Sequence, residues 1–208
     1  MSRPDVTVPA APRPGPQPGR AAWLVLAYRL PARHGLKVTI RRRLTAIGAV
    51  FPANAVAALP ASPAAERALR RLRSLIGEAG GSAQVLRAEV IEGAPDLAAA
   101  FNAARQREYA EIIAGCGQVL AGIEALTAAG QFRYPDLADQ DAELKRLAVR
   151  NDTIRTRDAL GAANAELALS SLARCRTAVD DFARRVYQTD SAAITGVVPG
   201  PRSPRAQP

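Results

Sequence analysis

Arginine and lysine side chains form the pattern in this sequence that most clearly points to chemistry. A guanidinium group stays charged at physiological pH, and its planar set of donors matches the oxygens of a phosphate group. One basic group lies at residues 33–42 and a second at 67–73, and both fall on segments with helical periodicity. The residues that we expect to contact nucleic-acid phosphates are Arg33, Lys37, Arg41, Arg42, Arg67, Arg70, Arg71 and Arg73.

Phosphate contacts by these side chains would make binding depend on salt without selecting a base sequence. The sequence contains no evident helix-turn-helix pattern, so no element is assigned to the reading of bases. The alternative interpretation is that the arginines only solvate helix faces, with Glu66 and Arg70 as an ion pair at the i,i+4 spacing.

The formal charge of +9 is unevenly distributed along the chain. Residues 21–93 hold eleven Lys or Arg against four Asp or Glu, which gives +7, whereas residues 94–190 hold twelve against fourteen, which gives −2. The positive field therefore belongs mainly to the front part of the chain, and a polyanion would be attracted there.

A polar group interrupts an apolar helical seam in the second half of the chain. It comprises Asn151, Arg155, Arg157 and Asp158. Polar residues on such a seam can fix helix register or the number of partners. A second interpretation is a pocket in which Asn151, Arg155 and Arg157 hold an oxyanion such as sulfate.

The two cysteines and the single histidine limit redox and metal chemistry. Cys116 and Cys175 form no CxxC pair, and His34 alone cannot build a common structural zinc site. Both cysteines lie on apolar seams, where cysteine packs as a small hydrophobe; a redox role for a thiolate is the alternative. We expect no enzyme activity, no catalytic residues, no cofactor and no metal. The densest acidic group complements the dipole at a predicted helix start: Asp136, Asp139, Asp141 and Glu143.

The front part of the chain alternates between strand and helix patterns. The expected elements are a strand at 23–30, a helix at 35–47, strands at 50–51 and 56–59 around a turn at 52–54, a helix at 63–79 and a strand at 84–91. Ser62 is the expected N-cap of the second helix, with Pro63 in its first turn. The order βαββαβ is typical of the ferredoxin-like fold, so we expect a basic α+β domain of this kind over residues 21–93.

Residues 94–190 carry an apolar repeat at steps of three and four, which predicts a helical domain. The pattern fits either a helical hairpin or a three-helix bundle. An unbroken helix from Pro135 to Tyr187 would favour packing against a second copy of the chain, and thus a homodimer. If the chain instead turns back near Gly161, Cys116 and Cys175 come to a similar level in a three-helix bundle.

The two ends of the chain contain little that a core could bury. The proline-rich residues 1–20 and the residues 191–208 are expected to be disordered tails. The short apolar segment Ala21 to Tyr28 lies behind a proline-rich tail and is followed by Arg29 without a cleavage-like Ala-x-Ala, so we do not expect a signal peptide. No other run approaches the roughly 18 residues that span a bilayer. We expect a soluble, cytoplasmic protein without a membrane partner.

A series of short motifs runs in order from Trp23 to Tyr187. The motifs are Trp23, Tyr28-Arg29-Leu30-Pro31, Leu44 with Gly48-Ala49, Asn54-x-Val56, Leu59-Pro60, Gly80-Gly81, Arg107-Glu108-Tyr109-Ala110-Glu111-Ile112, Ile154 with Arg157-Asp158, and Cys175 with Phe182 and Val186-Tyr187. In this order of motifs the chain resembles the N-terminal domain of the chromate-resistance regulator ChrB.

The resemblance implies transcriptional control of chromate-efflux genes, with duplex DNA as the partner. It also implies a C-terminal domain linked to the chromate response. We expect a stand-alone form without that domain, since the sequence ends soon after Tyr187. The competing class of function is a protein-interaction module that binds a separate chromate-sensing or regulatory chain and does not touch DNA.

Overall fold

The computed structural model describes residues 22–32 and 35–195, which fall into two compact units divided between Phe101 and Asn102. The expected tail at 1–20 lies outside the described residues. Of the tail expected at 191–208, residues 191–195 instead continue the last helix, and 196–208 lie outside the described residues. In chain order the elements are β1 (Trp23–Arg29), α1 (Leu36–Ala46), β2 (Val50–Ala53), β3 (Val56–Pro60), α2 (Pro63–Glu78), β4 (Ser82–Ala88), α3 (Ala94–Ala128), α4 (Tyr134–Arg157) and α5 (Ala165–Thr195).

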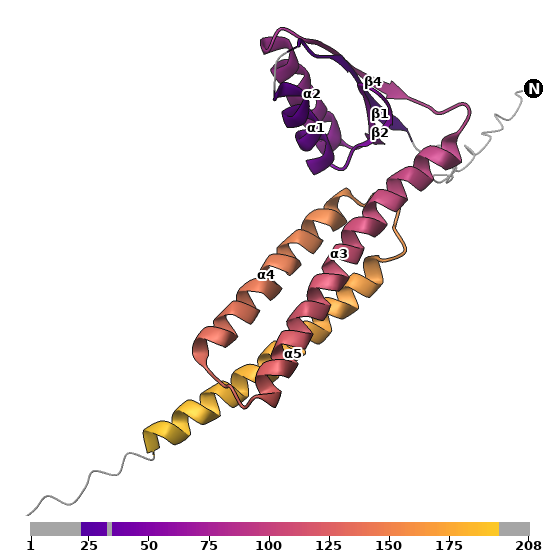
Figure 1. Cartoon of the computed structure of the whole chain (residues 1–208). Helices are drawn as coiled ribbons and strands as arrows, with labels where there is room; N and C mark the ends of the chain where they lie inside the picture. Colours follow the sequence, from indigo (N-terminus) through magenta and orange to yellow (C-terminus); the bar gives the residue numbers. More distant parts are fainter. Residues whose placement is uncertain (1–21, 33–34, 196–208) are drawn as a thin grey trace, which may run out of the picture. The chain divides into compact units, whose positions relative to one another are not determined.

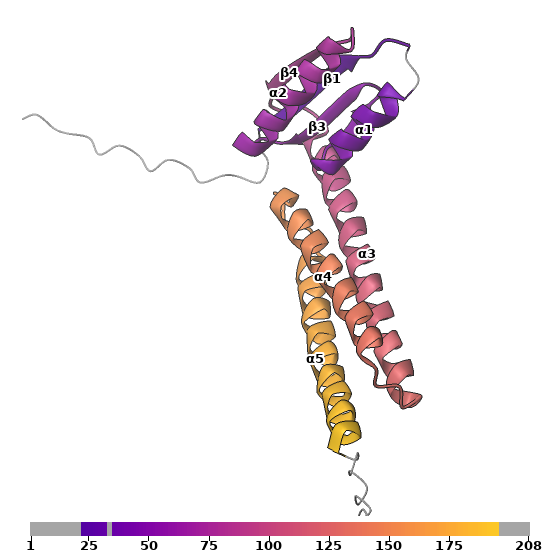
Figure 2. The same cartoon turned by 90° about the vertical axis from the view of Figure 1, so that its left-hand side faces the viewer.

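The first unit is built on a four-stranded antiparallel sheet with the strand order β2-β3-β1-β4. Both α1 and α2 lie on the same face of this sheet (Figures 1 and 2). The mixed α+β class expected from the sequence is therefore confirmed. Among the described residues, strand β4 forms one edge of the sheet and pairs with β1 along Ser82–Ala88.

The core of the first unit lies between the sheet and its two helices. Strand β1 alternates, so Leu24 and Leu26 face the helices and are almost completely buried. Helix α1 adds Ile40 and Leu44 from one face, as the spacing predicted. The remaining buried members of this core are Ala49, Ala57, Leu59, Ala65, Leu69, Leu72 and Ile76.

Helix α2 begins where its sequence predicted. The backbone N–H of Ala65 donates to the Ser62 hydroxyl at 3.1 Å. Pro63 occupies the first turn, where a backbone N–H would have no hydrogen-bond partner within the helix, so its missing N–H costs nothing. Gly48 follows the end of α1 with a φ of 87°, a conformation in which a side chain would be strained.

The β2–β3 connection differs from its prediction. We expected Pro52 and Ala53 in a turn, but β2 continues through both, and the turn lies at Asn54 and Ala55. Strand β2 is an edge strand, so the missing N–H of Pro52 removes no required hydrogen bond. The last strand was also placed too far along the chain: β4 is Ser82–Ala88.

The second unit consists of the rest of α3 with α4 and α5, which lie side by side (Figure 1). All three helices contribute to one apolar core, so the three-helix alternative is the observed one. The chain leaves α4 at Arg157 and starts α5 at Ala165, and Gly161 lies in the connection. The buried members are Tyr109, Ile112, Cys116, Val119, Ile123, Leu137, Leu144, Leu147, Ile154, Ala162, Ala168, Leu172, Cys175, Val179, Phe182 and Val186.

Helix α3 is long and apolar enough, by length and composition, to cross a membrane. The expectation that no other run approaches this length is therefore wrong for α3, whose isolated charged residues stand among many Ala, Gly and Ile residues and made the apolar stretch look shorter. Its side chains Tyr109, Ile112 and Cys116 are buried in the core of the second unit, which accounts for one apolar face.

Candidate nucleic-acid interface

Helix α1 presents its basic side chains to solvent. Lys37, Arg41 and Arg42 are all exposed, on the part of the helix turned away from Ile40 and Leu44. The guanidinium of Arg41 lies 4.3 Å from the centre of the Phe51 ring, a cation–π contact that orients it over β2. Arg33, also expected to contact phosphate, lies outside the described residues.

The four arginines of α2 do not form a single group. All are exposed, but only Arg70 and Arg73 lie on the flank of the helix that faces β4. Arg67 and Arg71 project from other parts of the helix circumference, as the angle of 100° per residue requires. The structure therefore divides the predicted phosphate contacts between a groove and an open helical surface.

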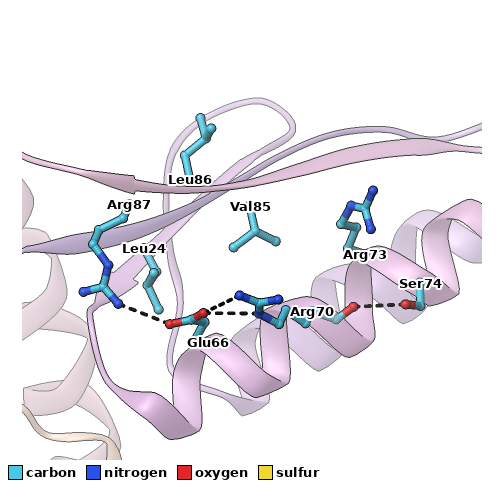
Figure 3. Close-up of a pocket in the computed structure, with 8 residues that line it drawn as sticks. All are labelled: Leu24, Glu66, Arg70, Arg73, Ser74, Val85, Leu86 and Arg87. Carbon is cyan, nitrogen blue, oxygen red and sulfur yellow. Dashed lines mark hydrogen bonds and ion pairs between the residues drawn. The ribbon is translucent and has the colours of Figure 1, made fainter.

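The groove lies between α2 and β4 and has a volume of about 600 Å³ (Figure 3). It is lined by Leu24, Glu66, Arg70, Arg73, Ser74, Val85, Leu86 and Arg87. The carboxylate of Glu66 connects the two elements. One of its oxygens accepts from Arg70 Nη2 at 2.7 Å and Arg70 Nε at 3.2 Å, and the other accepts from Arg87 Nη2 at 3.2 Å.

Arg87 is a groove residue that the sequence did not identify. It is the register partner of Leu24, and directly opposed residues on neighbouring strands share a face of the sheet. Since Leu24 faces the helices, Arg87 also points toward α2. The sequence placed Arg87 inside a predicted strand. It did not show that Arg87 lies beside Glu66, because that depends on how this strand pairs with a strand far away in the sequence.

The groove is electropositive even with Glu66 in place. Three arginines and one carboxylate line it, which leaves a net charge of +2. The hydrogen bond and the charge of Arg70 lower the pKa of Glu66, and Arg87 contributes in the same direction. Glu66 is thus ionised at neutral pH, and the Glu66–Arg70 pair expected at i,i+4 is present.

The polar group of the bundle connects α4 to α3. The Tyr109 hydroxyl donates to Asp158 at 3.2 Å, and Asp158 accepts from the backbone N–H groups of Gly161 at 3.1 Å and Ala162 at 3.0 Å. Burial and the neighbouring Asp158 raise the pKa of Tyr109 to about 12. Asp158 therefore holds both the α4–α5 connection and a side chain of α3.

The other members of the predicted seam site are separated by the structure. Arg157 is 16% exposed and pairs with Glu108 of α3 at 3.3 Å, and burial lowers its pKa. Arg155 is exposed, whereas Asn151 is buried and, among the described residues, its side-chain oxygen accepts no hydrogen bond. An oxyanion beside Arg157 would meet the carboxylate of Glu108. The observed contacts connect helices, and oxyanion binding here stays a prediction.

The two cysteines lie together in the core of the second unit. The Cys175 thiol donates to the backbone oxygen of Cys116 at 3.2 Å. Burial raises the pKa of Cys116 to about 12, and burial also raises the pKa of Cys175. Because the thiolate is the reactive form, both thiols are protected from nucleophilic chemistry. Over residues 22–32 and 35–195, no three His, Cys, Asp or Glu side chains form a group that could hold a metal ion.

Comparison with known proteins extends this description. Residues 37–193, more than half of the chain, match the family described as "Protein ChrB, N-terminal". The chain belongs to the ChrB N-terminal family. The resemblance inferred from the ordered motifs is thereby confirmed, and it relates the chain to chromate resistance. The ChrB match begins in α1, so β1 precedes the matched range. A search among curated proteins finds no match.

Proposed function

We propose that this ChrB-family chain is a non-enzymatic regulator of chromate-resistance genes that binds duplex DNA through its first unit. The observation that supports this function most strongly is the convergence of three arginines on the α2–β4 groove. The exposed basic residues of α1 and α2 extend the positive surface over the same unit. Backbone phosphates are the part of DNA that such a surface attracts.

The first unit is proposed to be a version of the ferredoxin-like fold. Its element order is βαββαβ, and both helices cover one face of the sheet (Figure 2). In this arrangement α1 and α2 form the outer layer of the unit, so their solvent-facing arginines are available to a duplex. The sheet fixes the spacing of the two helices, and with it the spacing of the phosphate contacts.

The second unit is proposed to form a homodimer in the cytoplasm, with no membrane partner. Large apolar side chains are exposed on its helices, and they include Val149 on α4 with Leu167 and Tyr187 on α5. Burying them between two copies would remove apolar surface from water. A dimer would carry two basic first units and contact twice as many phosphates.

Binding of the purified full chain to duplex DNA tests the proposed function. The duplex upstream of its own gene is compared with an unrelated duplex of equal length. The test variant changes Arg41, Arg42, Arg70 and Arg71 to Ala. The control variant changes Lys145, Arg174, Arg176 and Arg184 to Ala, which removes the same charge from exposed positions of the second unit.

We expect preference for the upstream duplex, and we expect the test variant to lose binding while the control variant retains it. Equal, weak binding of both duplexes that disappears with added salt would contradict a regulatory role. In that case a salt-insensitive complex with another regulatory chain would become the better account of this protein.

A further inference from the structure

Glu66 occupies the point of the groove at which two guanidinium groups from different elements converge. Arg70 comes from α2 and Arg87 from β4, and their side chains reach the same carboxylate (Figure 3). The carboxylate bonds to Arg70 Nη2 at 2.7 Å and to Arg87 Nη2 at 3.2 Å. The protein thus contains a formed anion site that one of its own side chains fills.

The same donors suit a phosphate group. Guanidinium groups bind carboxylates and phosphates by similar charge-assisted hydrogen bonds, and a phosphate offers more acceptor oxygens than a carboxylate. Arg73 lines the same groove about two turns farther along α2 and adds positive charge to it. An incoming phosphate would therefore meet the two guanidinium groups that hydrogen-bond to Glu66 in the structure, in a groove that carries a third.

Exchange of Glu66 for an external anion requires access from solvent, and the site provides it. The side chains of Arg70 and Arg87 are 72% and 59% exposed, and that of Glu66 is 31% exposed. Ion pairs at this exposure are weak because solvent screens them, so a modest competitor can displace the carboxylate. The backbone of α2 need not move, because Glu66 has rotatable side-chain bonds of its own.

We propose that the α2–β4 groove is a phosphate-binding site and that Glu66 is its internal competitor, which holds Arg70 and Arg87 in place until a phosphate replaces it. With a nucleic-acid backbone as the source of phosphate, this inference rests on the proposed function. A free phosphate ion is the alternative ligand of the site. With either ligand, Glu66 lowers the affinity of the groove for phosphate, because the phosphate must first displace its carboxylate.

Removing the charge of Glu66 should strengthen binding. Glu66→Gln keeps the shape of the side chain but no longer competes as an anion, so the affinity for a duplex should rise about fivefold at low salt. Removing one negative charge anywhere on the first unit would also favour binding to DNA, so a control for net charge is required. The matched control is Glu78→Gln on the same helix, outside the groove, which should change affinity less than about twofold.

The gain must also depend on the groove arginines. In a chain that carries Arg70→Ala and Arg87→Ala, the added Glu66→Gln change should leave duplex affinity unaltered. Equal gains from Glu66→Gln and Glu78→Gln, or a gain that persists without the two arginines, would overturn the inference. Either result leaves salt-dependent binding by the unaltered chain, and therefore the proposed function, in place.

Inorganic phosphate tests the site without DNA. Titration into the full-length Glu66→Gln chain should shift the Nε–Hε NMR signals of Arg70 and Arg87 at lower phosphate concentration than in the unaltered chain. If neither the unaltered chain nor the Glu66→Gln variant binds duplex DNA but these signals shift, the proposed function fails and the groove is a site for free phosphate. If neither duplex nor phosphate perturbs the groove arginines, the inference itself is overturned.

Discussion

Loss of the Tyr109 hydroxyl should weaken the second unit by a defined amount. Tyr109→Phe removes the hydrogen bond to Asp158 and leaves the aromatic ring in the core. A hydrogen bond to a charged acceptor contributes about 1.5–3 kcal/mol, and a length of 3.2 Å favours the lower end of that range. Asp158 retains the N–H groups of Gly161 and Ala162, so the expected loss is about 1–2 kcal/mol.

Replacing Asp158 itself should cost more. Asp158→Ala removes the acceptor of the Tyr109 hydroxyl and of two backbone donors in the α4–α5 connection, for an expected loss of about 3 kcal/mol. In the double variant the tyrosine change should add little, because its acceptor is already absent. The coupling free energy between the two positions should therefore be nearly the whole single-variant loss, about 1–2 kcal/mol.

Urea unfolding of the full chain measures these losses. Circular dichroism at 222 nm follows mainly the long helices of the second unit, while fluorescence of Trp23, the single tryptophan, follows the first unit. Tyr134→Phe is the matched control, since Tyr134 is 61% exposed and its change should cost less than about 0.5 kcal/mol. Equal effects of the two tyrosine changes, or additive effects of Tyr109→Phe and Asp158→Ala, would refute the assigned contact.

Three further expectations concern backbone space and buried thiols. Gly81→Ala should destabilise the first unit by about 2 kcal/mol or more in urea unfolding, because its Cβ would lie 2.6 Å from the backbone oxygen of Arg29. Gly77→Ala, in open space on α2, should instead stabilise it by about 0.5–1 kcal/mol, and the opposite order would contradict the packing. Cys116 and Cys175 should react with a thiol reagent at pH 8 only as fast as the second unit unfolds, so rapid labelling of the folded chain would show that they are not buried. The pKa of Cys116 rises from about 9 to about 12 on folding, so its contribution to the free energy of unfolding should be present below pH 9 and be lost as the pH rises toward 12. The Cys116→Ala variant should therefore lose less stability than the unaltered chain between pH 9 and pH 12 in unfolding experiments. An equal loss of stability in the two proteins would contradict the pKa shift.

Local sequence signals predicted the parts of the fold that depend on neighbouring residues. The apolar spacing of Ile40 and Leu44 identified α1, and Ser62 with Pro63 identified the start of α2. The polar seam near Gly161 indicated where the chain turns back. The relation between Cys116 and Cys175 followed from that turn, and their contact is present.

Contacts between distant residues could not be predicted in this way. Arg87 faces Glu66 only because β4 pairs with β1 in one register and α2 packs beside it. The partners Tyr109 and Asp158 are likewise 49 residues apart in sequence. Helical spacing showed that the α2 arginines spread around the helix, but it did not show which of them share a groove.

The salt dependence of duplex binding tests the central claim most directly. The logarithm of the binding constant is measured against the logarithm of salt concentration for the unaltered chain, for the variant with Ala at 41, 42, 70 and 71, and for the second-unit control. The slope is negative, and each lost phosphate contact reduces its magnitude by about 0.9. The magnitude should therefore fall by roughly 2 to 4 in the first variant and hardly change in the control. Identical slopes for all three proteins, or no measurable binding by the unaltered chain, would contradict a phosphate-binding surface on α1 and α2.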